Sequence, residues 1–315
     1  AGAEGRVVRI PRAGEPNWTW GPMDDIKAEW WSWNNPGRPW DLRKTVNGTE
    51  MHRAIDTENL TRSKEHYEGA YIWPEYGWVM GTPYPTRVRE FDAKTRSLVF
   101  GGQWGSNAGS YHIGRYCRYY LEDKPHYLDD AENGEFWFDR KEAGGRLYIR
   151  LPNDADPNDA RIEVAKRITL IDSKAMRHVR ISGLTFRFTN VLWDLDALPT
   201  RGPDVDPACI RLLGSGEDII IANCRFEHVH MGIRMKAVGE DAAIDRVRVR
   251  DNTFAHTDHG AMILADGGAW GVKYPQGRLY DVEVLRNSMY RIGMRPSRYG
   301  QRHAMNIDCA ETAHI

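Results

Sequence analysis

The chain lacks the features that identify several large classes of protein. None of its apolar runs approaches the roughly 18–20 residues that cross a bilayer. It also lacks a surplus of charge, because 43 basic residues nearly balance 44 acidic ones and leave a net charge of −1. A chain without a basic surplus has no general attraction for nucleic acid. We therefore expect neither a membrane span nor a nucleic-acid partner.

Sequence signatures of several enzyme classes are missing as well. The sequence has no H-E-x-x-H, no G-x-S-x-G, no Walker loop and no dinucleotide fingerprint, which disfavours metalloproteases, α/β-hydrolases and nucleotide-binding enzymes. The four cysteines form no C-x-x-C pair, so a zinc ribbon or a redox motif is not expected. Buried free thiols are the simpler interpretation of Cys117, Cys209, Cys224 and Cys309.

Tryptophan is concentrated near the start of the chain. Six of the twelve tryptophans lie in the first 40 residues: Trp18, Trp20, Trp30, Trp31, Trp33 and Trp40. An indole packs well on the apolar face of a sugar ring, so one hypothesis is a carbohydrate-binding surface. The alternative, which we favour, is that these side chains are buried in a loop-rich region.

The first part of the chain, residues 1–118, is a Trp-, Gly- and Pro-rich region with little sustained periodicity. We expect it to be irregular β structure packed on, or inserted in, the domain that follows. Its strand candidates are Arg6–Ile10, Ala70–Met80 and Ser97–Phe100, and Glu50–His66 is a helix candidate. Residues 119–160 form a connecting segment, in which the alternating runs 134–139 and 145–149 predict a β-hairpin.

An internal repeat occupies the rest of the chain, residues 161–315. Each repeat has apolar residues at its positions 1, 3 and 8, and position 6 holds Cys224, Asn252 or Asn287 in three of the four copies. The copies begin 40, 28 and 35 residues apart, and they are Val179–Phe186, Ile219–Phe226, Val247–Phe254 and Val282–Met289. Unequal spacing is typical of a solenoid, in which insertions become loops.

A second strand candidate accompanies each repeat: Cys209–Leu213, Gly232–Lys236, Gly260–Leu264 and Ala304–Asp308. Alternation points one residue pair of each strand inward: Ile210 and Leu212, Ile233 and Met235, Ala261 and Ile263, Met305 and Ile307. A strand, a bend, a second strand and a variable loop describe one coil of a right-handed parallel β-helix. The alternative is an antiparallel sandwich, which needs turns at about 8–12-residue spacing and fits less well.

The sequence from Tyr119 onward resembles a known superfamily. The segments "HVRISGLTF", "DIIIANCRFEHVHMGI" and "RVRVRDNTFAHTDHGAMIL" resemble the pectin-lyase-like right-handed β-helix proteins. The preceding hairpin, with Trp137, Asp139 and Leu147-Tyr148, is most similar to that of bacterial carbohydrate-active β-helix enzymes. This resemblance implies an all-β fold. It leaves open whether the activity is that of a glycoside hydrolase, a polysaccharide lyase or an epimerase.

Aligning the coils gathers polar residues on one outer wall. Adjacent coils lie roughly 4.8 Å apart, so residues in register become neighbours. His228 aligns with His256 and Arg291, and His230 aligns with Asp258, which His259 follows. Arg211 neighbours Arg234, and Lys236 neighbours Asp308. Asp266 ends the strand that starts at Gly260, and His303 precedes the next. We expect one shallow groove.

The wall suggests cleavage of a glycosidic bond. Hydrolysis needs two carboxylates, and Asp258 with Asp266 is the first choice, with Asp308 as the substitute. His256 and His259 complete the predicted catalytic set. The predicted substrate-binding residues are Arg211, Arg234, Lys236, His228, His230, Arg291, His303 and Asp308.

Two other functions stay open. A polysaccharide lyase would use Arg211, Arg234 or Lys236 to neutralise a uronate and His256 as the base. A non-catalytic carbohydrate-binding or surface protein would use the same groove without chemistry. A further alternative is that His228 and His256 simply stack on each other as a ladder and take part in no chemistry.

Cofactor, location and partner complete the expectations. No cofactor is expected, and a calcium site is not indicated, because the coils carry no dense cluster of carboxylates. A further acidic group lies in an insertion between the first two repeats: Asp194, Asp196, Asp204 and Asp206. One hypothesis is that it binds a cation or lines the groove, and the alternative, which we favour, is a solvated loop. The substrate partner would be a polysaccharide or oligosaccharide, and the location secreted or periplasmic. A coil that starts at Thr312 is unfinished at Ile315, so we expect a partner or a further segment to cap it.

Overall fold

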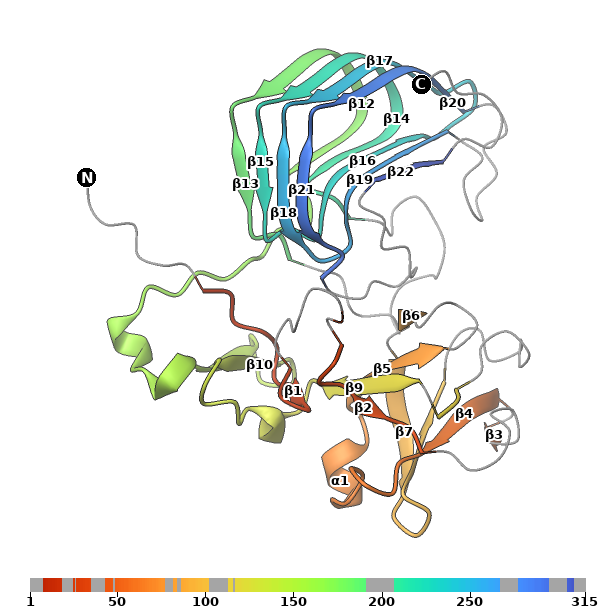
Figure 1. Ribbon diagram of the computed structural model, residues 1–315, viewed down its shortest axis with the longest axis vertical. Coiled ribbons are helices and arrows are strands. Elements are labelled where there is room, and N and C mark those ends of the chain that lie inside the picture. The colour runs from red at the N-terminus through yellow and green to blue at the C-terminus, as the bar shows by residue number, and fades with distance from the viewer. Residues whose placement is uncertain are drawn as a thin grey trace. The chain divides into compact units, whose positions relative to one another are not determined.

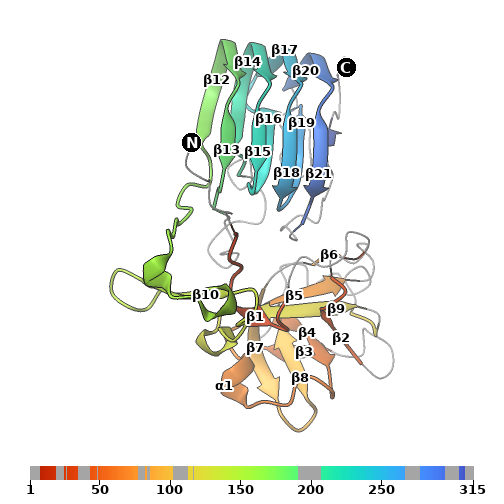
Figure 2. The same ribbon diagram turned by 60° about the vertical axis from the view of Figure 1, so that its left-hand side comes forward.

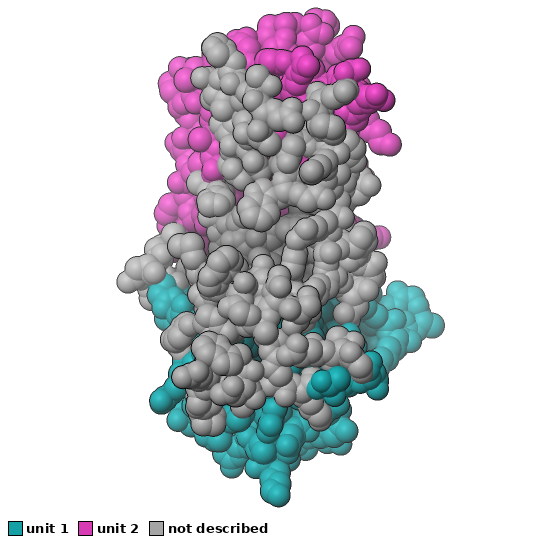
Figure 3. Space-filling model, turned by 90° about the vertical axis from the view of Figure 1, so that its right-hand side faces the viewer, with its two compact units in different colours: residues 1–163, 298–300 teal, residues 164–297, 301–315 magenta. Residues whose placement is uncertain are grey.

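The computed structural model describes residues 8–18, 25, 27–34, 43–47, 49–76, 82–83, 86–101, 113–115, 117–190, 207–266, 277–294 and 305–308. They form β structure with one short helix, α1 (Lys64–Tyr67). The chain divides into two compact units (Figure 3). Unit 1 holds residues 1–163 and 298–300, and unit 2 holds residues 164–297 and 301–315. No helix in the described part of the chain is long and apolar enough to cross a membrane.

Unit 1 contains a nine-stranded sheet whose paired strands are antiparallel, in the order β1-β9-β5-β7-β8-β4-β3, with β2 on β9 and β6 on β5 (Figure 1). Its strands are β1 (Gly14–Glu15), β2 (Trp31–Ser32), β3 (Arg43–Val46), β4 (Thr49–Ile55), β5 (Tyr71–Tyr76), β6 (Thr82–Pro83), β7 (Thr86–Asp92), β8 (Ser97–Phe100) and β9 (Arg118–Glu122).

The described tryptophans of unit 1 serve mainly as core. Trp18, Trp30 and Trp33 are buried. The Trp33 ring stacks on Tyr119 with centroids 3.7 Å apart and also on Phe100. The burial interpretation therefore holds for these three indoles, and a sugar-stacking role does not. Trp31 is partly buried against the same core, and Trp20 and Trp40 lie outside the described residues.

The helix predicted over Glu50–His66 is wrong. Residues 49–55 form β4 between β3 and β8, and burial alternates along it, as a strand requires. Asp56 ends the strand, because its side chain accepts hydrogen bonds from the backbone N–H groups of Glu58 and Asn59 and holds a turn. Within the predicted range only its last three residues are helical, as part of α1 (Lys64–Tyr67).

The other expectations for unit 1 fare better. The predicted hairpin is confirmed as β10 (Glu135–Asp139) paired with β11 (Arg146–Arg150). The prediction for 97–100 matches β8, and that for 70–80 contains β5. The described part of the first candidate, residues 8–10, carries no strand. The described residues of this unit also form 3₁₀ turns at Pro125–Tyr127, Pro152–Asp154 and Pro157–Asp159.

Unit 2 consists of two parallel sheets (Figures 1 and 2). The seven-stranded sheet has the order β20-β17-β14-β16-β19-β22, with β12 on β14, and the other has the order β13-β15-β18-β21. The strands are β12 (Ile171–Ser182), β13 (Thr185–Arg187), β14 (Ile210–Ala222), β15 (Arg225–Glu227), β16 (Met231–Ala237), β17 (Ala243–Arg250), β18 (Thr253–Thr257), β19 (Gly260–Ala265), β20 (Arg278–Leu285), β21 (Ser288–Ile292) and β22 (Met305–Asp308).

The larger sheet curls, and β14 spans the bend. Its first half, residues 210–214, pairs with β16, whereas residues 216–222 pair with β17. Figure 1 shows β16, β19 and β22 turning back under β12, β17 and β20. The single strand β14 therefore belongs to both arms of the curled sheet, one on each side of the bend.

The strand register reproduces the repeat read from the sequence. Val179 lies beside Ile219, which lies beside Val247, which lies beside Val282. The second strands align in the same way, through Ile210, Ile233, Met262 and Met305. These parallel neighbours lie 28 to 40 residues apart in the first series and 23 to 43 in the second, and their pairing excludes the antiparallel sandwich for this unit.

One detail of the predicted alternation is wrong. The register puts Met262 and Leu264 level with the core residues Ile233 and Met235, and Ile263 level with Arg234, whereas Ala261 does belong to the core cluster. The sequence Asp258-His259-Gly260 adds one residue before the strand, since Gly260 pairs with Met231. A one-residue shift moves each side chain to the opposite face of a sheet.

Candidate functional site

Three basic residues lie on the face of the sheet that is opposite to its apolar core. Along β16 the core takes Ile233 and Met235, so alternation turns Arg234 and Lys236 the other way. Arg211 on β14 lies in register with Arg234. Arg234 and Lys236 are nevertheless only 8% and 3% exposed. Both side chains are therefore almost fully buried, whereas the sequence placed them in a shallow groove.

Arg211 is engaged at the edge of this row. Its guanidinium donates to both carboxylate oxygens of Asp172, at 2.9 and 2.7 Å. This bidentate pair lowers the pKa of Asp172 below its usual value. Arg211 thus belongs to a partly exposed ion pair, and Arg234 and Lys236 form the buried part of the row.

The first choice of carboxylate pair is not brought together. Asp258 precedes β19 and Asp266 follows it, and both are fully buried. The six residues of β19 span about 17 Å at roughly 3.3 Å per residue. Glycosidases hold their two carboxylates roughly 5–9.5 Å apart. Asp258 and Asp266 therefore sit at opposite ends of one strand and do not flank a single bond.

Asp266 has a closer acidic neighbour along the sheet. Ala265 on β19 pairs with Asp308 on β22, so Asp266 and Asp308 lie at the same end of adjacent strands. Lys236 pairs with Ala265 on the other side. Lys236 and Asp308 are thus in one row but not neighbours, because Ala265 separates them. The structure describes the backbone of Asp308 and not its side chain.

The opposite end of β16 and β19 carries a second polar group. His230 and Asp258 lie side by side, as the repeat predicts, because the Asp258 N–H donates to the Val229 carbonyl at 3.1 Å. The rings of His230 and His259 are 5.5 Å apart. The His230 N–H donates to the Thr189 hydroxyl at 2.8 Å, which fixes this turn. His230 and His259 are buried, as Asp258 is.

His228, His256 and Arg291 occupy a corner of unit 2. Each has a positive φ, at 52°, 54° and 51°, and Phe188 continues the column at 56°. The two histidine rings stack at 4.9 Å, and Phe188 stacks on His228 at 5.5 Å. The predicted alignment is therefore observed as a ladder of planar side chains at a bend. His228 lies two residues before His230 in the chain, and most of β16 separates it from Lys236.

His303 and the acidic group at 194–206 lie outside the described residues. Cys117, Cys209 and Cys224 are buried free thiols, and burial raises the pKa of Cys209 to about 12. No group of three or more His, Cys, Asp or Glu side chains in the described ranges is arranged to hold a metal ion.

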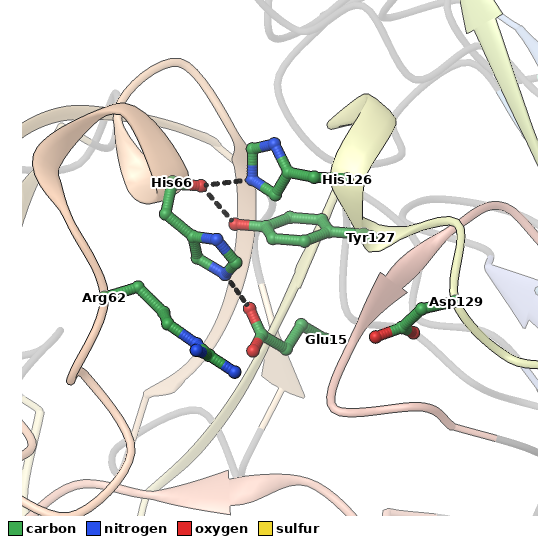
Figure 4. Close-up of a pocket in the computed structure, with 6 residues that line it drawn as sticks. All are labelled: Glu15, Arg62, His66, His126, Tyr127 and Asp129. Carbon is green, nitrogen blue, oxygen red and sulfur yellow. Dashed lines mark hydrogen bonds and ion pairs between the residues drawn. The ribbon is translucent and has the colours of Figure 1, made fainter.

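Sequence reasoning missed a pocket in unit 1. It has a volume of about 260 Å³ and is lined by Glu15, Arg62, His66, His126, Tyr127 and Asp129 (Figure 4). These residues come from β1, from α1 and the loop before it, and from the turn at 125–129. They follow no repeat or spacing rule, so no signal in a single sequence points to them.

Comparisons with known proteins give little further guidance. No protein-family model and no curated protein matches the chain. A solved structure named "Glycoside hydrolase" aligns with 96% of this chain and 81% of its own, at 12% identity and a TM-score of 0.34. A likeness at that level assigns neither a fold nor an activity.

Proposed function

We propose that the chain is a secreted or periplasmic carbohydrate-active enzyme of right-handed parallel β-helix architecture. In this proposal it hydrolyses glycosidic bonds of a polysaccharide at the end of β16, β19 and β22. The observation that carries the proposal is the burial of Asp266 and Lys236 at that end, on strands whose apolar residues face the core. Burying ionisable groups is costly, and such groups concentrate at functional sites.

The architecture is supported by the constant parallel register of both strand series. Strands that return every 23 to 43 residues to lie beside their predecessors are what successive coils of a solenoid produce. In such a stack the ends of adjacent strands align, so residues far apart in sequence gather in one row.

The roles follow from the rows. Asp266 and Asp308, on adjacent strands, are the proposed acid and base or nucleophile. Lys236 is in register with Ala265 and Asp308, and Arg234 lies two residues before Lys236 on the same strand. Both are proposed to bind hydroxyl or carboxylate groups of the glycan. His230, His259 and Asp258 lie one strand length from Asp266 and are proposed to bind a more distant sugar rather than to cleave.

A panel of polysaccharides, assayed for release of reducing ends, tests this assignment. We expect Asp266→Asn and Asp308→Asn each to lower the rate roughly 10²–10⁴-fold, the usual range for losing a general acid or base. Asp251→Asn is the matched control, because Asp251 is a corner carboxylate of the same unit, paired with Arg286. Circular dichroism of each variant checks folding. Full activity of both Asp266→Asn and Asp308→Asn would remove the assignment.

The same panel separates the alternatives. The buried cations Arg234 and Lys236 on one strand favour a uronate lyase as the second candidate, since two positively charged side chains suit an anionic sugar. Products with the ultraviolet absorbance of an unsaturated uronate would establish the lyase in place of the hydrolase. Binding of a glycan with no cleavage product of either kind would favour the non-catalytic module.

A further inference from the structure

The pocket of unit 1 is small, polar and built from segments distant in sequence. The side chains of Glu15 and His66 meet across it, although 51 residues separate them. Its volume of about 260 Å³ lies just below the roughly 300–1,000 Å³ of sites for drug-sized ligands. An occupant of one or two small rings fits this space.

The back of the pocket is fixed by hydrogen bonds. The Nε2 atom of His66 lies 2.5 Å from a Glu15 carboxylate oxygen. The Tyr127 hydroxyl donates to the His66 carbonyl at 2.8 Å, and His126 Nε2 lies 3.1 Å from the same oxygen (Figure 4). Tyr127 is 2% exposed, and burial raises its pKa, so it stays a neutral phenol. The site is therefore preorganised, which lowers the entropic cost of binding.

Two side chains at the pocket have unused bonding capacity. The Arg62 guanidinium and the Asp129 carboxylate make no hydrogen bond or ion pair with another side chain of the described residues. The two residues form hydrogen bonds through their own backbone groups: the Arg62 N–H donates to the Tyr67 hydroxyl, the Asp129 N–H donates to Glu135, and the Asp129 carbonyl accepts from Arg150. They flank Glu15 in Figure 4. A ligand between them meets hydrogen-bond donors from Arg62 and acceptors from Glu15 and Asp129.

The charges at the pocket indicate which ligand fits. Glu15 and Asp129 are acidic, Arg62 is basic, and His66 is paired with Glu15. No surplus positive charge is left to favour an anion, which disfavours phosphate or a uronate. A ring of hydroxyl groups donates and accepts at once, as this lining requires. The rings of His66 and His126, with centroids 4.4 Å apart, add planar faces for its C–H groups.

We propose that this pocket is a binding site for a neutral saccharide of one or two rings, separate from the site proposed on unit 2. Arg62, Glu15 and Asp129 hold its hydroxyl groups, and the histidine rings contact its apolar side. This inference stands on the pocket alone and does not require that unit 2 cleaves glycosidic bonds.

Saturation-transfer NMR and calorimetry on the whole chain test the proposal, with D-glucose, D-galactose, D-xylose and cellobiose as probes and D-galacturonate and glycine as charged comparators. We expect at least one neutral sugar to bind in preference to both comparators. Arg62→Met and Asp129→Asn should each weaken that sugar at least about tenfold. The control Asp159→Asn, an exposed carboxylate of the same unit outside the pocket lining, should leave affinity unchanged.

A second variant distinguishes the two proposed sites. Asp266→Asn should bind the sugar as the wild type does, whether or not it has lost activity. Loss of sugar binding in Asp266→Asn but not in Arg62→Met would place the binding on unit 2 and overturn this inference. Preferential binding of galacturonate or glycine, or no binding of any neutral sugar, would overturn it as well.

Discussion

At the scale of single residues, the buried carboxyl group of Glu135 joins two of the segments that line the pocket. Glu135 is 2% exposed. One of its oxygens accepts from the Gly14 N–H, and the other accepts from the N–H groups of Asp129 and Asp130, all at 3.1 Å. It thereby ties the strand that carries Glu15 to the turn that carries Asp129. Burial raises its pKa from 4.5 to about 7, although these three hydrogen bonds act in the opposite direction.

Stability should consequently depend on pH through Glu135. Between pH 4.5 and about 7 the unfolded chain has released this proton while the folded chain keeps it, so stability falls as the pH rises. At 1.36 kcal/mol per pKa unit the loss is about 3 kcal/mol. Glu135→Gln cannot ionise and should lose less stability than the wild type between pH 5 and pH 7.5, measured by urea unfolding. Equal losses in both proteins would show that Glu135 is already ionised at pH 5.

At the scale of elements, an asparagine ladder fixes the turns of unit 2. The Asn252 side chain accepts from the Cys224 N–H at 2.9 Å and donates to the Ile221 carbonyl and to Asn287 Oδ1, each at 3.0 Å. It is 1% exposed, so no solvent replaces these partners. One side chain thus joins three successive repeats at the point where each strand turns.

Asn252→Ala should therefore destabilise the protein strongly. Its loss leaves a buried N–H and a buried carbonyl unsatisfied, at about 1–3 kcal/mol for each group. We expect a total loss of about 2–5 kcal/mol in urea unfolding. Ser288→Ala, at an exposed position in the next repeat, is the control and should change stability by less than about 0.5 kcal/mol. Similar effects of the two substitutions would mean that the ladder adds nothing.

The secondary-structure elements show which parts of the fold could be predicted from the sequence alone. The repeat predicted the register of unit 2 because identical spacing at positions such as Val247 and Asn252 leaves one way to stack the strands. It misplaced Ile263 because the added residue before Gly260 is invisible until strands are paired. In unit 1 the helix prediction failed because pairing of β4 with β3 and β8 outweighs local propensity.

The candidate sites likewise contain residues that the repeat predicts and features that it does not. Lys236, Asp266 and Asp308 lie in or beside the predicted rows, since rows follow from the repeat. The burial of Arg234 and Lys236 was not predictable, because strand alternation gives the face of a side chain and not how far that face is covered. The pocket at His66 arises from three segments that contact one another only in the folded unit.

At the scale of the whole molecule, each unit has its own apolar core. In unit 2 the Phe226 ring lies between Phe186 and Phe254, at centroid distances of 5.0 and 4.7 Å, and is fully buried. In unit 1 Leu98 is fully buried in a separate cluster. Separate cores are what domains that fold independently have.

We therefore expect core substitutions to act within one unit. Phe226→Ala removes a buried ring at a cost of about 3–5 kcal/mol and should speed hydrogen–deuterium exchange in β14, β15 and β17, because those strands open together. Exchange in β5 and β9 of unit 1 should keep its wild-type rate. Leu98→Ala should give the converse pattern, with faster exchange in β4, β7 and β8 and unchanged protection in unit 2. Exchange that rises in both units with either substitution would show that the chain opens as one cooperative body, because an unfolding event shared by both cores cannot be confined to the strands around one of them.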